Sequence, residues 1–237
     1  MSRWTLPLVA LFGAILGALV MTGLDRFVPG ASPGRAGLNA AIRDYLLSNP
    51  EVIPEAMQRL QDRETGKQVA SRRADIVTPV GSAWAGNPKG DVTMVEYFDY
   101  NCGYCRASLP LIDKLLASDP KLRIVYRELP VLSPISHTAA LASLAAARQG
   151  HFAAFHQALY ALGPVSDASI AAAAAKAGVT VPAKASPADE AEITRNLKTA
   201  SELGMTGTPS WVIGNRVLAG ALPIETLQEA ITAARGR

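Results

Sequence analysis

Two cysteines, Cys102 and Cys105, are separated by two residues and are the only cysteines in this chain of 237 residues. Residues 91–98, just before them, are rich in β-branched and aromatic residues and indicate a buried strand. Residues 107–116, just after them, carry apolar residues at helical spacing. The first sulfur therefore falls at a helix N-terminus, where unpaired backbone N–H groups and the helix dipole favour a negative charge. We expect Cys102 to ionise more easily than a free cysteine.

This placement predicts thiol–disulfide chemistry, because the thiolate is the nucleophile in disulfide exchange. In this interpretation Cys102 attacks, and Cys105, one helical turn on, resolves the mixed disulfide. The Cys102–Cys105 disulfide is then the redox group, and we expect no other cofactor.

Two other uses of such a pair stay open. One is half of a zinc site, but zinc normally takes four ligands. The sequence holds no second cysteine pair, and its histidines lie far downstream, at His137, His151 and His156. We therefore expect no metal. The other is a purely structural disulfide, although a two-residue gap at a helix start tends to strain such a bridge.

Two stretches resemble one known family. Residues 94–105, Met-Val-Glu-Tyr-Phe-Asp-Tyr-Asn-Cys-Gly-Tyr-Cys, resemble the active-site strand and motif of the DsbA-type thiol–disulfide oxidoreductases, which have the thioredoxin fold. Residues 203–220 resemble the Gly-Thr-Pro loop and following hairpin of the same family. The resemblance implies that the Thr208–Pro209 bond is cis and that Pro209 packs beside the disulfide. From the residues alone, an ordinary trans loop remains the alternative, since most X–Pro bonds are trans.

Further residues near the motif have expected roles. Glu96, six residues before Cys102, occupies the strand position where DsbA-type enzymes carry a buried acid. There it could relay a proton to or from Cys105; a salt-bridged strand carboxylate is the alternative. Gly103 and Tyr104 stand between the cysteines, where many DsbA-type motifs place a histidine, so the resemblance leaves the oxidising power open.

Two charged residues flank the motif more closely. Asp99 ends the predicted strand, and Arg106 directly follows Cys105. We expect both side chains to be solvated.

The fold class predicted is α/β, a thioredoxin-like fold with a helical insertion. Residues 122–128 form a second strand, whose parallel pairing with residues 91–98 uses the intervening helix as a crossover. We also expect a short strand at 76–80, followed by a loop at 81–91. The alanine-rich run at about 135–204 is the insertion, and residues 222–237 form the closing helix.

The segments before this domain suggest export. Residues 4–24 are an uncharged run about long enough to cross a bilayer at about 1.5 Å per helical residue. Residues 1–26 are accordingly a signal anchor or a signal peptide, and an uncleaved anchor is favoured because no convincing cleavage site follows. Residues 27–37 read as a linker. Residues 38–75 form an amphipathic helical extension, and residues 76–237 form the thioredoxin-like domain.

The extension carries apolar stripes at helical spacing, which either pack on the core or self-associate. The stripe residues are Leu38, Ile42, Tyr45, Leu46, Ile53, Met57 and Leu60. The segment resembles the N-terminal extension of a DsbA-like subgroup that includes the suppressor-of-copper-sensitivity C and Com-type exported proteins. Because some members oligomerise through it, the resemblance implies a possible homo-oligomer through residues 38–75.

Composition narrows the choice of partners. A formal net charge of +3, without a basic cluster, gives no reason to expect nucleic acid. An oxidising thiol enzyme belongs where disulfides persist. We therefore expect a periplasmic location, at the inner membrane if residues 4–24 stay attached and soluble if they are cleaved. The expected partners are unfolded or cysteine-bearing exported proteins and a membrane redox partner.

Three functions follow from these observations. The first is a disulfide oxidase that donates the Cys102–Cys105 disulfide to exported clients. The second is an oligomeric disulfide isomerase or reductase, which a self-associating extension would favour. The third is a copper-binding or chaperone-like module whose two thiols hold soft Cu(I).

Overall fold

The computed structural model describes residues 34–236 of the chain. By its contacts the chain divides into two compact units, residues 1–57 and residues 58–237. The expected membrane segment, residues 4–24, and most of the expected linker lie outside the described residues. Within residues 34–236, no helix combines the length and the apolar character that crossing a bilayer requires.

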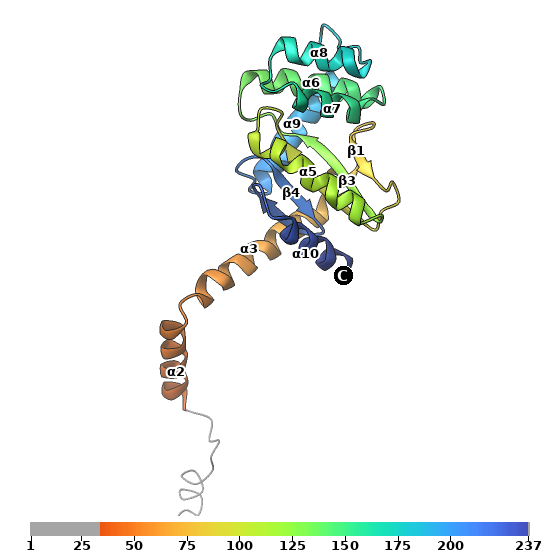
Figure 1. Cartoon of the computed structure of the whole chain (residues 1–237). Coiled ribbons are helices and arrows are strands. Elements are labelled where there is room, and N and C mark those ends of the chain that lie inside the picture. Colours follow the sequence, from red (N-terminus) through yellow and green to blue (C-terminus); the bar gives the residue numbers. More distant parts are fainter. Residues whose placement is uncertain (1–33, 237) are drawn as a thin grey trace, which may run out of the picture. The chain divides into compact units, whose positions relative to one another are not determined.

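The described residues form helices and five strands, labelled in Figure 1. The helices are α2 (Arg35–Ser48), α3 (Val52–Ser71), α4 (Arg73–Val77), α5 (Gly103–Ser118), α6 (Pro134–Arg148), α7 (Phe152–Ala161), α8 (Asp167–Ala177), α9 (Pro187–Glu202) and α10 (Ile224–Arg235). The strands are β1 (Trp84–Gly86), β2 (Val92–Phe98), β3 (Leu122–Glu128), β4 (Ser210–Ile213) and β5 (Arg216–Ala219).

The strands form one sheet in the order β1-β3-β2-β4-β5. Strands β2 and β3 are parallel, joined by α5 as the expected crossover, while the other neighbouring pairs are antiparallel. The β4–β5 hairpin turns at Gly214, whose positive φ of 60° suits glycine. The thioredoxin-like α/β fold predicted from the sequence is thereby confirmed.

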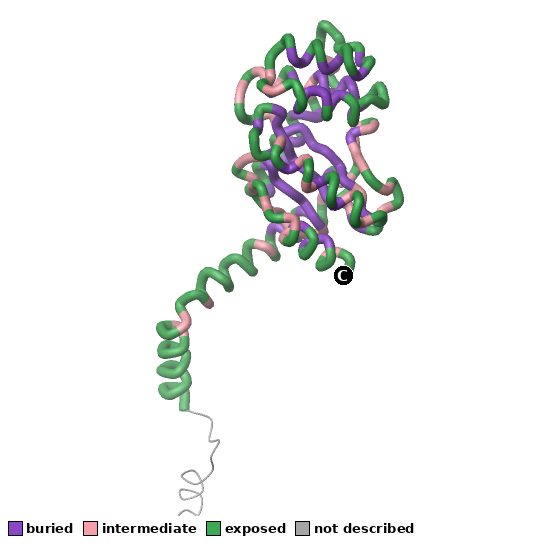
Figure 2. Tube along the Cα trace, in the orientation of Figure 1, coloured by how far each residue is buried: buried purple, intermediate pink, exposed green. Residues whose placement is uncertain are grey.

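Helices cover both faces of the sheet because the central strands are apolar on both sides. Met94 and Phe98 belong to a core shared with α5, α7 and α10. Val95 and Tyr97, which alternate with them along β2, belong to a second core with the C-terminal part of α3, with α4 and with α9. Figure 2 shows the sheet buried between these layers. The side-chain alternation along β2 thus decides which residues face α5.

The predicted strand at residues 76–80 is wrong. Residues 73–77 form the short helix α4, which buries Ile76 against the sheet. The carbonyl oxygens of Ile76 and Thr78 accept hydrogen bonds from the Arg127 side chain on β3, so they need no strand partner. The edge strand β1 lies instead at Trp84–Gly86, inside the segment expected to be a loop, and pairs with β3.

Four helices, α6 to α9, lie between β3 and β4 and form the expected insertion. Local signals define their ends: Pro134 opens α6, a Ser166 capping box opens α8, and Ser186 caps α9. In Figure 1, α6, α7 and α8 gather at one end of the sheet. The insertion is therefore packed structure that borders the active-site end of α5.

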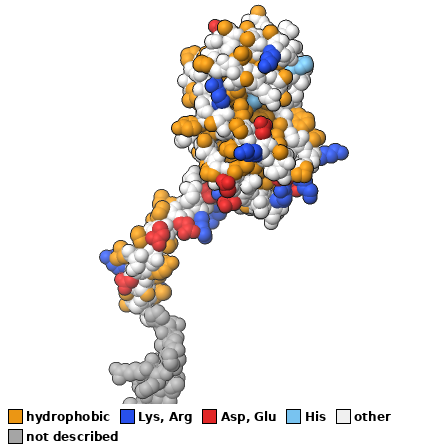
Figure 3. Space-filling model, in the orientation of Figure 1, with side chains coloured by type: hydrophobic (Ala, Val, Ile, Leu, Met, Phe, Trp, Pro, Cys, Tyr) orange, Lys and Arg blue, Asp and Glu red, His pale blue; other side chains and the backbone are white. Residues whose placement is uncertain are grey.

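The expected extension divides between the two units. In the first unit, α2 has no buried residue, and its apolar side chains Leu38, Ile42 and Tyr45 are exposed. Hydrophobic side chains stand out along it in Figure 3. In the second unit, Val69 near the end of α3 is fully buried in the core behind the sheet.

Candidate active site

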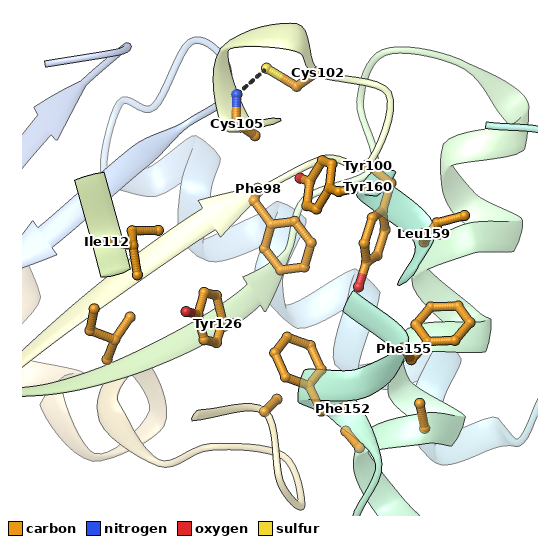
Figure 4. Packing of buried hydrophobic residues seen from close by; sticks show 14 of the residues in the cluster. Phe98, Tyr100, Cys102, Cys105, Ile112, Tyr126, Phe152, Phe155, Leu159 and Tyr160 are labelled. Atoms are coloured by element: carbon orange, nitrogen blue, oxygen red, sulfur yellow. Dashed lines mark hydrogen bonds between the residues drawn. The ribbon is translucent and has the colours of Figure 1, made fainter. Parts of the chain in front are cut away.

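Cys102 caps the N-terminus of α5. Its backbone is extended, with φ −86° and ψ 114°, and the helix begins at the next residue. Its Sγ accepts a hydrogen bond from the backbone N–H of Cys105 at 3.3 Å (Figure 4). An N-cap side chain normally accepts a hydrogen bond from such a free N–H. A thiolate at this position also lies at the positive end of the helix dipole. The geometry therefore suits an attacking thiolate.

The two cysteines are free thiols in this structure and differ in access. Cys102 is 5% exposed and Cys105 only 1% exposed. Between them, Gly103 is exposed and the Tyr104 side chain is 68% exposed. An incoming sulfur would accordingly reach Cys102 before Cys105.

The Gly-Thr-Pro loop lies against the first cysteine. The Cys102 thiol donates a hydrogen bond to the carbonyl oxygen of Thr208 at 3.2 Å. The Thr208–Pro209 peptide bond is cis, the isomer that the family resemblance implied. Ser210 donates from its hydroxyl to the carbonyl of Gly207 at 2.7 Å, which ties the loop to the start of β4. Two segments far apart in sequence thus meet at one sulfur.

Glu96 is buried on β2, near enough for its charge to act on Cys105. It is 1% exposed and shares the α5-facing side of β2 with Met94 and Phe98. Its Oε2 has no hydrogen-bond partner, and no ion pair involving Glu96 occurs among the described residues. Burial raises the pKa of Glu96 from 4.5 to about 8.

The Cys105 thiol is held in its protonated form. Burial, and after it the charge of Glu96, raises the pKa of the Cys105 thiol far above its usual value. Cys105 therefore needs a proton acceptor when it attacks and a proton donor when it leaves. A carboxyl with a pKa near 8 suits both tasks at neutral pH. Glu96, whose charge acts on Cys105, remains the candidate for this role.

Asp99 is buried, contrary to the expectation that it would be solvated. Its Oδ1 accepts from the backbone N–H of Asn101 at 2.8 Å, and its Oδ2 accepts from Val131 and Leu132 at 3.0 Å each. The carboxylate thus joins the active-site turn to the loop after β3. An Asp at a strand end that hydrogen-bonds two residues on is a known turn signal, but its long-range partners leave no trace in the local sequence.

Arg106 also departs from its expected place in water. Its side chain is half-buried, and Nη2 donates to the carbonyl oxygen of Gly163 in the loop between α7 and α8. The first turn of α5 is thereby tied to the helical insertion.

Aromatic rings support the site from below (Figure 4). Tyr100 lies edge-on to Phe98, with ring centroids 5.1 Å apart, and its hydroxyl lies 2.9 Å from the Ser143 hydroxyl. Tyr160 on α7 donates to the carbonyl oxygen of Asp99 at 3.1 Å. The local sequence around Tyr100 and Tyr160 does not indicate these hydrogen bonds. They hold the turn between β2 and α5 from the insertion side.

The cysteine pair is the redox group that these residues offer. Among residues 34–236, no cluster of three or more His, Cys, Asp or Glu side chains is placed to hold a metal ion. A dithiol at a helix start, a cis-proline loop beside it and a central β-sheet define the class of thioredoxin-fold thiol–disulfide oxidoreductases.

Family models agree with this class. The model of the DSBA-like thioredoxin domain matches residues 93–232, more than half of the chain, so the chain belongs to that family. The model of the copper resistance protein ScsC N-terminal domain matches residues 35–65, over α2 and most of α3. The DsbA-type family is the one that the two sequence motifs predicted, and the ScsC match falls largely on the extension whose resemblance to that subgroup was noted.

Solved structures are similar over most of their length. A thioredoxin-like oxidoreductase from Silicibacter pomeroyi is 36% identical, with a TM-score of 0.65 over 70% of this chain and 98% of that one. A linker-deletion mutant of Proteus mirabilis ScsC is 27% identical, with a TM-score of 0.67 over 87% of this chain and 99% of that one. A periplasmic thioredoxin-like protein from Salmonella enterica is 29% identical, with a TM-score of 0.64 over 70% and 96%.

Two curated proteins match part of the chain. They are Na⁺/H⁺ antiporters, NhaA 1 of Salinispora arenicola and NhaA 3 of Salinispora tropica, each 30% identical over 156 residues. The match covers 63% of this chain and 24% of each antiporter, so the chain spans about a quarter of the length of these relatives.

Proposed function

We propose that this protein exchanges disulfides with cysteine-bearing proteins exported to the periplasm, with Cys102 as the reacting sulfur. The observation that carries the proposal is the N-cap position of Cys102, between the Cys105 N–H and the Thr208 carbonyl. The periplasmic location is supported by the similarity to a protein described as periplasmic and to ScsC. Anchoring through residues 4–24 and a membrane redox partner remain part of this proposal.

In the oxidative direction, a client thiolate attacks Cys102 Sγ of the enzyme disulfide. The Cys102–Cys105 bond breaks, and Cys105 leaves as a thiolate that takes a proton from Glu96. A second client thiolate then attacks the client sulfur of the mixed disulfide, forming the client disulfide and releasing the Cys102 thiolate. The client loses two electrons, and the enzyme disulfide gains them.

Oxidation of clients is the first candidate direction. A helix N-terminus stabilises the thiolate, which exists only in the reduced enzyme, and stabilising the reduced form makes a disulfide more oxidising. The residues between the cysteines, Gly103 and Tyr104, add no cationic partner. The helix N-terminus is therefore the source of oxidising power that the described geometry supports.

Isomerisation in an oligomer is the second candidate, and the exposed face of α2 favours it. None of the described residues covers the apolar side chains on this helix, with Tyr45 58% exposed and Ile42 49% exposed. Water-exposed apolar stripes of this kind commonly mark contacts between proteins. An assembly through this face would bring several dithiols together, so that one could reduce a wrong client disulfide while another reforms a correct one.

A ribonuclease A refolding assay with two substrates, the reduced and the scrambled enzyme, distinguishes oxidation from isomerisation. We expect the purified, oxidised protein to restore activity to reduced ribonuclease A, and the Cys102→Ser variant to be inactive. If isomerisation is the function, the reduced protein also recovers scrambled ribonuclease A. That activity, and the oligomeric mass in sedimentation, should then be lost in an Ile42→Gln/Tyr45→Gln variant.

The matched control is Asn39→Gln, a polar-to-polar change on the same helix, which should alter neither mass nor activity. Recovery of scrambled ribonuclease by a monomer would reject the oligomeric isomerase. If the folded protein acted on neither reduced nor scrambled ribonuclease A, disulfide exchange with clients would be rejected. The copper-binding alternative would then be favoured.

A further inference from the structure

A groove with a volume of about 360 Å³ lies between the end of α9, the loop after β3 and the loop that leads to Pro209. None of the residues that line this groove is charged. Its apolar side chains are those of Leu129, Val131, Leu197, Ala200 and Met205. The groove therefore favours an uncharged, apolar group over a charged one.

Two side chains of this lining are open to water. Val131 is 49% exposed and Leu197 is 38% exposed. Leu132, next to Val131 in the chain, is exposed as well. The free energy gained by removing apolar surface from water grows with the area removed. A partner that covers these side chains with an apolar group therefore gains binding free energy.

The groove adjoins the reacting sulfur through two of its lining residues. Gly207 directly precedes Thr208, whose carbonyl oxygen accepts a hydrogen bond from the Cys102 thiol at 3.2 Å. The backbone N–H of Val131 donates at 3.0 Å to the carboxylate of Asp99, three residues before Cys102. A polypeptide that is joined to Cys102 by a disulfide is thereby held next to the groove.

Hydrogen bonds fix the walls of the groove. The chain leaves α9 through Gly204, whose positive φ of 70° suits glycine, and the Met205 N–H donates to the carbonyl oxygen of Ala200 at 2.8 Å. On the other side, the Ser210 hydroxyl donates to the carbonyl oxygen of Gly207 at 2.7 Å. Because the walls are already ordered, little conformational entropy is lost there when a partner binds.

We propose, on the basis of the client exchange proposed above, that this groove binds an apolar side chain of the client close to the client's reacting cysteine. The mixed disulfide brings the client here, because it ties the client's cysteine to Cys102. In an extended chain alternate side chains point the same way, so the residue two positions from the cysteine also points toward the enzyme, about 7 Å along the chain. The protein therefore favours client cysteines that have an apolar residue two positions away.

A matched pair of peptides tests the side chain. One is acetyl-Ser-Leu-Ser-Cys-Ser-Leu-Ser-amide, and the other has serine in place of both leucines. Each reduced peptide is mixed with the oxidised full-length protein, and its thiolate attacks Cys102 while Cys105 leaves. The reaction is quenched with acid, and the products are quantified by mass spectrometry. We expect the leucine peptide to have a second-order rate constant about tenfold larger, which is equivalent to about 1.4 kcal/mol.

The two ways in which this experiment can fail are distinguishable. Equal rates for the two peptides would overturn the inference about the groove and leave disulfide exchange intact. If neither peptide reacted, the proposed exchange would be rejected, and the inference with it.

A matched pair of variants tests the place of binding. Leu197 and Leu162 are both exposed, but only Leu197 lines the groove. Leu197→Ser should reduce the preference for the leucine peptide to about threefold or less, because it removes part of the apolar wall. Leu162→Ser should leave the preference at its wild-type value. The ratio compares two peptides on the same variant, so a loss of stability that slows both reactions does not change it.

A preference that survives Leu197→Ser would overturn the proposal. If Leu197→Ser also lowered the mass in sedimentation while the preference stayed intact, the groove would belong to a contact between copies of the chain rather than to the client.

Discussion

At the scale of single residues, the two cysteines have opposite environments although they are one helical turn apart. Cys102 receives a backbone N–H and can be reached from solvent, whereas Cys105 is buried near an acid. The first sulfur is thus placed for attack, the second is held protonated by burial, and we propose that Glu96 takes its proton. The two cysteine side chains are chemically identical. Their different expected roles follow from their different burial and hydrogen bonding.

Glu96 should make the stability of the fold depend on pH. Its pKa is raised to about 8 from 4.5, so the folded state holds this proton more tightly than the unfolded chain does. Its stabilising contribution is therefore complete below about pH 4.5 and is lost as the pH rises toward 8. Relative to wild type, Glu96→Gln should gain stability with rising pH in this window, by at most about 1.4 kcal/mol per pH unit.

Urea unfolding of both proteins at pH 5, 6, 7 and 8 measures this difference. Glu128, whose pKa is also raised by burial, is present in both proteins, so only the part of its shift that comes from the charge of Glu96 differs between them. Glu229→Gln, at an exposed position of α10, is the control and should show no trend with pH. A constant difference between wild type and Glu96→Gln across the range would show that the Glu96 carboxyl is not held neutral by the fold.

At the scale of elements, one arginine connects three layers of the structure. Arg127 on β3 is buried and forms an ion pair with Glu192 on α9. The same guanidinium donates to backbone carbonyls at the end of α4 and just after it. Arg127 thereby links α4 and α9 to β3.

Arg127→Met should destabilise the protein by about 3–5 kcal/mol, because it leaves several backbone carbonyls without their donor and the buried Glu192 carboxylate with only Arg195 as its partner. Arg235→Met is the control, since Arg235 pairs with Asp91 and Asp119 near the surface and should cost much less. The midpoints of urea unfolding compare the two variants. Similar small losses for both would mean that the Arg127 network does not hold α4 and α9 in place.

The same network explains where sequence reasoning failed. An apolar run from Ile76 to Val80 reads locally as a strand, but the carbonyls that a strand would pair are taken by Arg127, which is far away in sequence. Strand β1 was missed because three residues at a sheet edge give no measurable periodicity. By contrast, the positions of β2, α5 and β3 could be predicted, because the apolar residues in their sequence patterns are the residues that the fold buries.

At the scale of the whole molecule, the site is assembled from segments that no local pattern connects. The start of α5, the Thr208–Pro209 loop and Glu96 on β2 meet at the cysteine pair, and Tyr160 of the insertion holds the turn before it. The cysteine motif and the proline loop could be predicted because each carries a recognisable sequence. The roles of Asp99, Tyr100 and Tyr160 could not, because they depend on contacts between distant elements.

The most direct test of the account is to ask which sulfur holds the client. Cys105→Ala and Cys102→Ala variants are exported in a bacterium, and free thiols are alkylated at lysis. Mixed disulfides are then separated without reductant and mapped by mass spectrometry. The account predicts that Cys105→Ala accumulates client adducts through Cys102, whereas Cys102→Ala accumulates far fewer. Adducts of equal abundance in both variants, or none in the folded and exported Cys105→Ala protein, would contradict it.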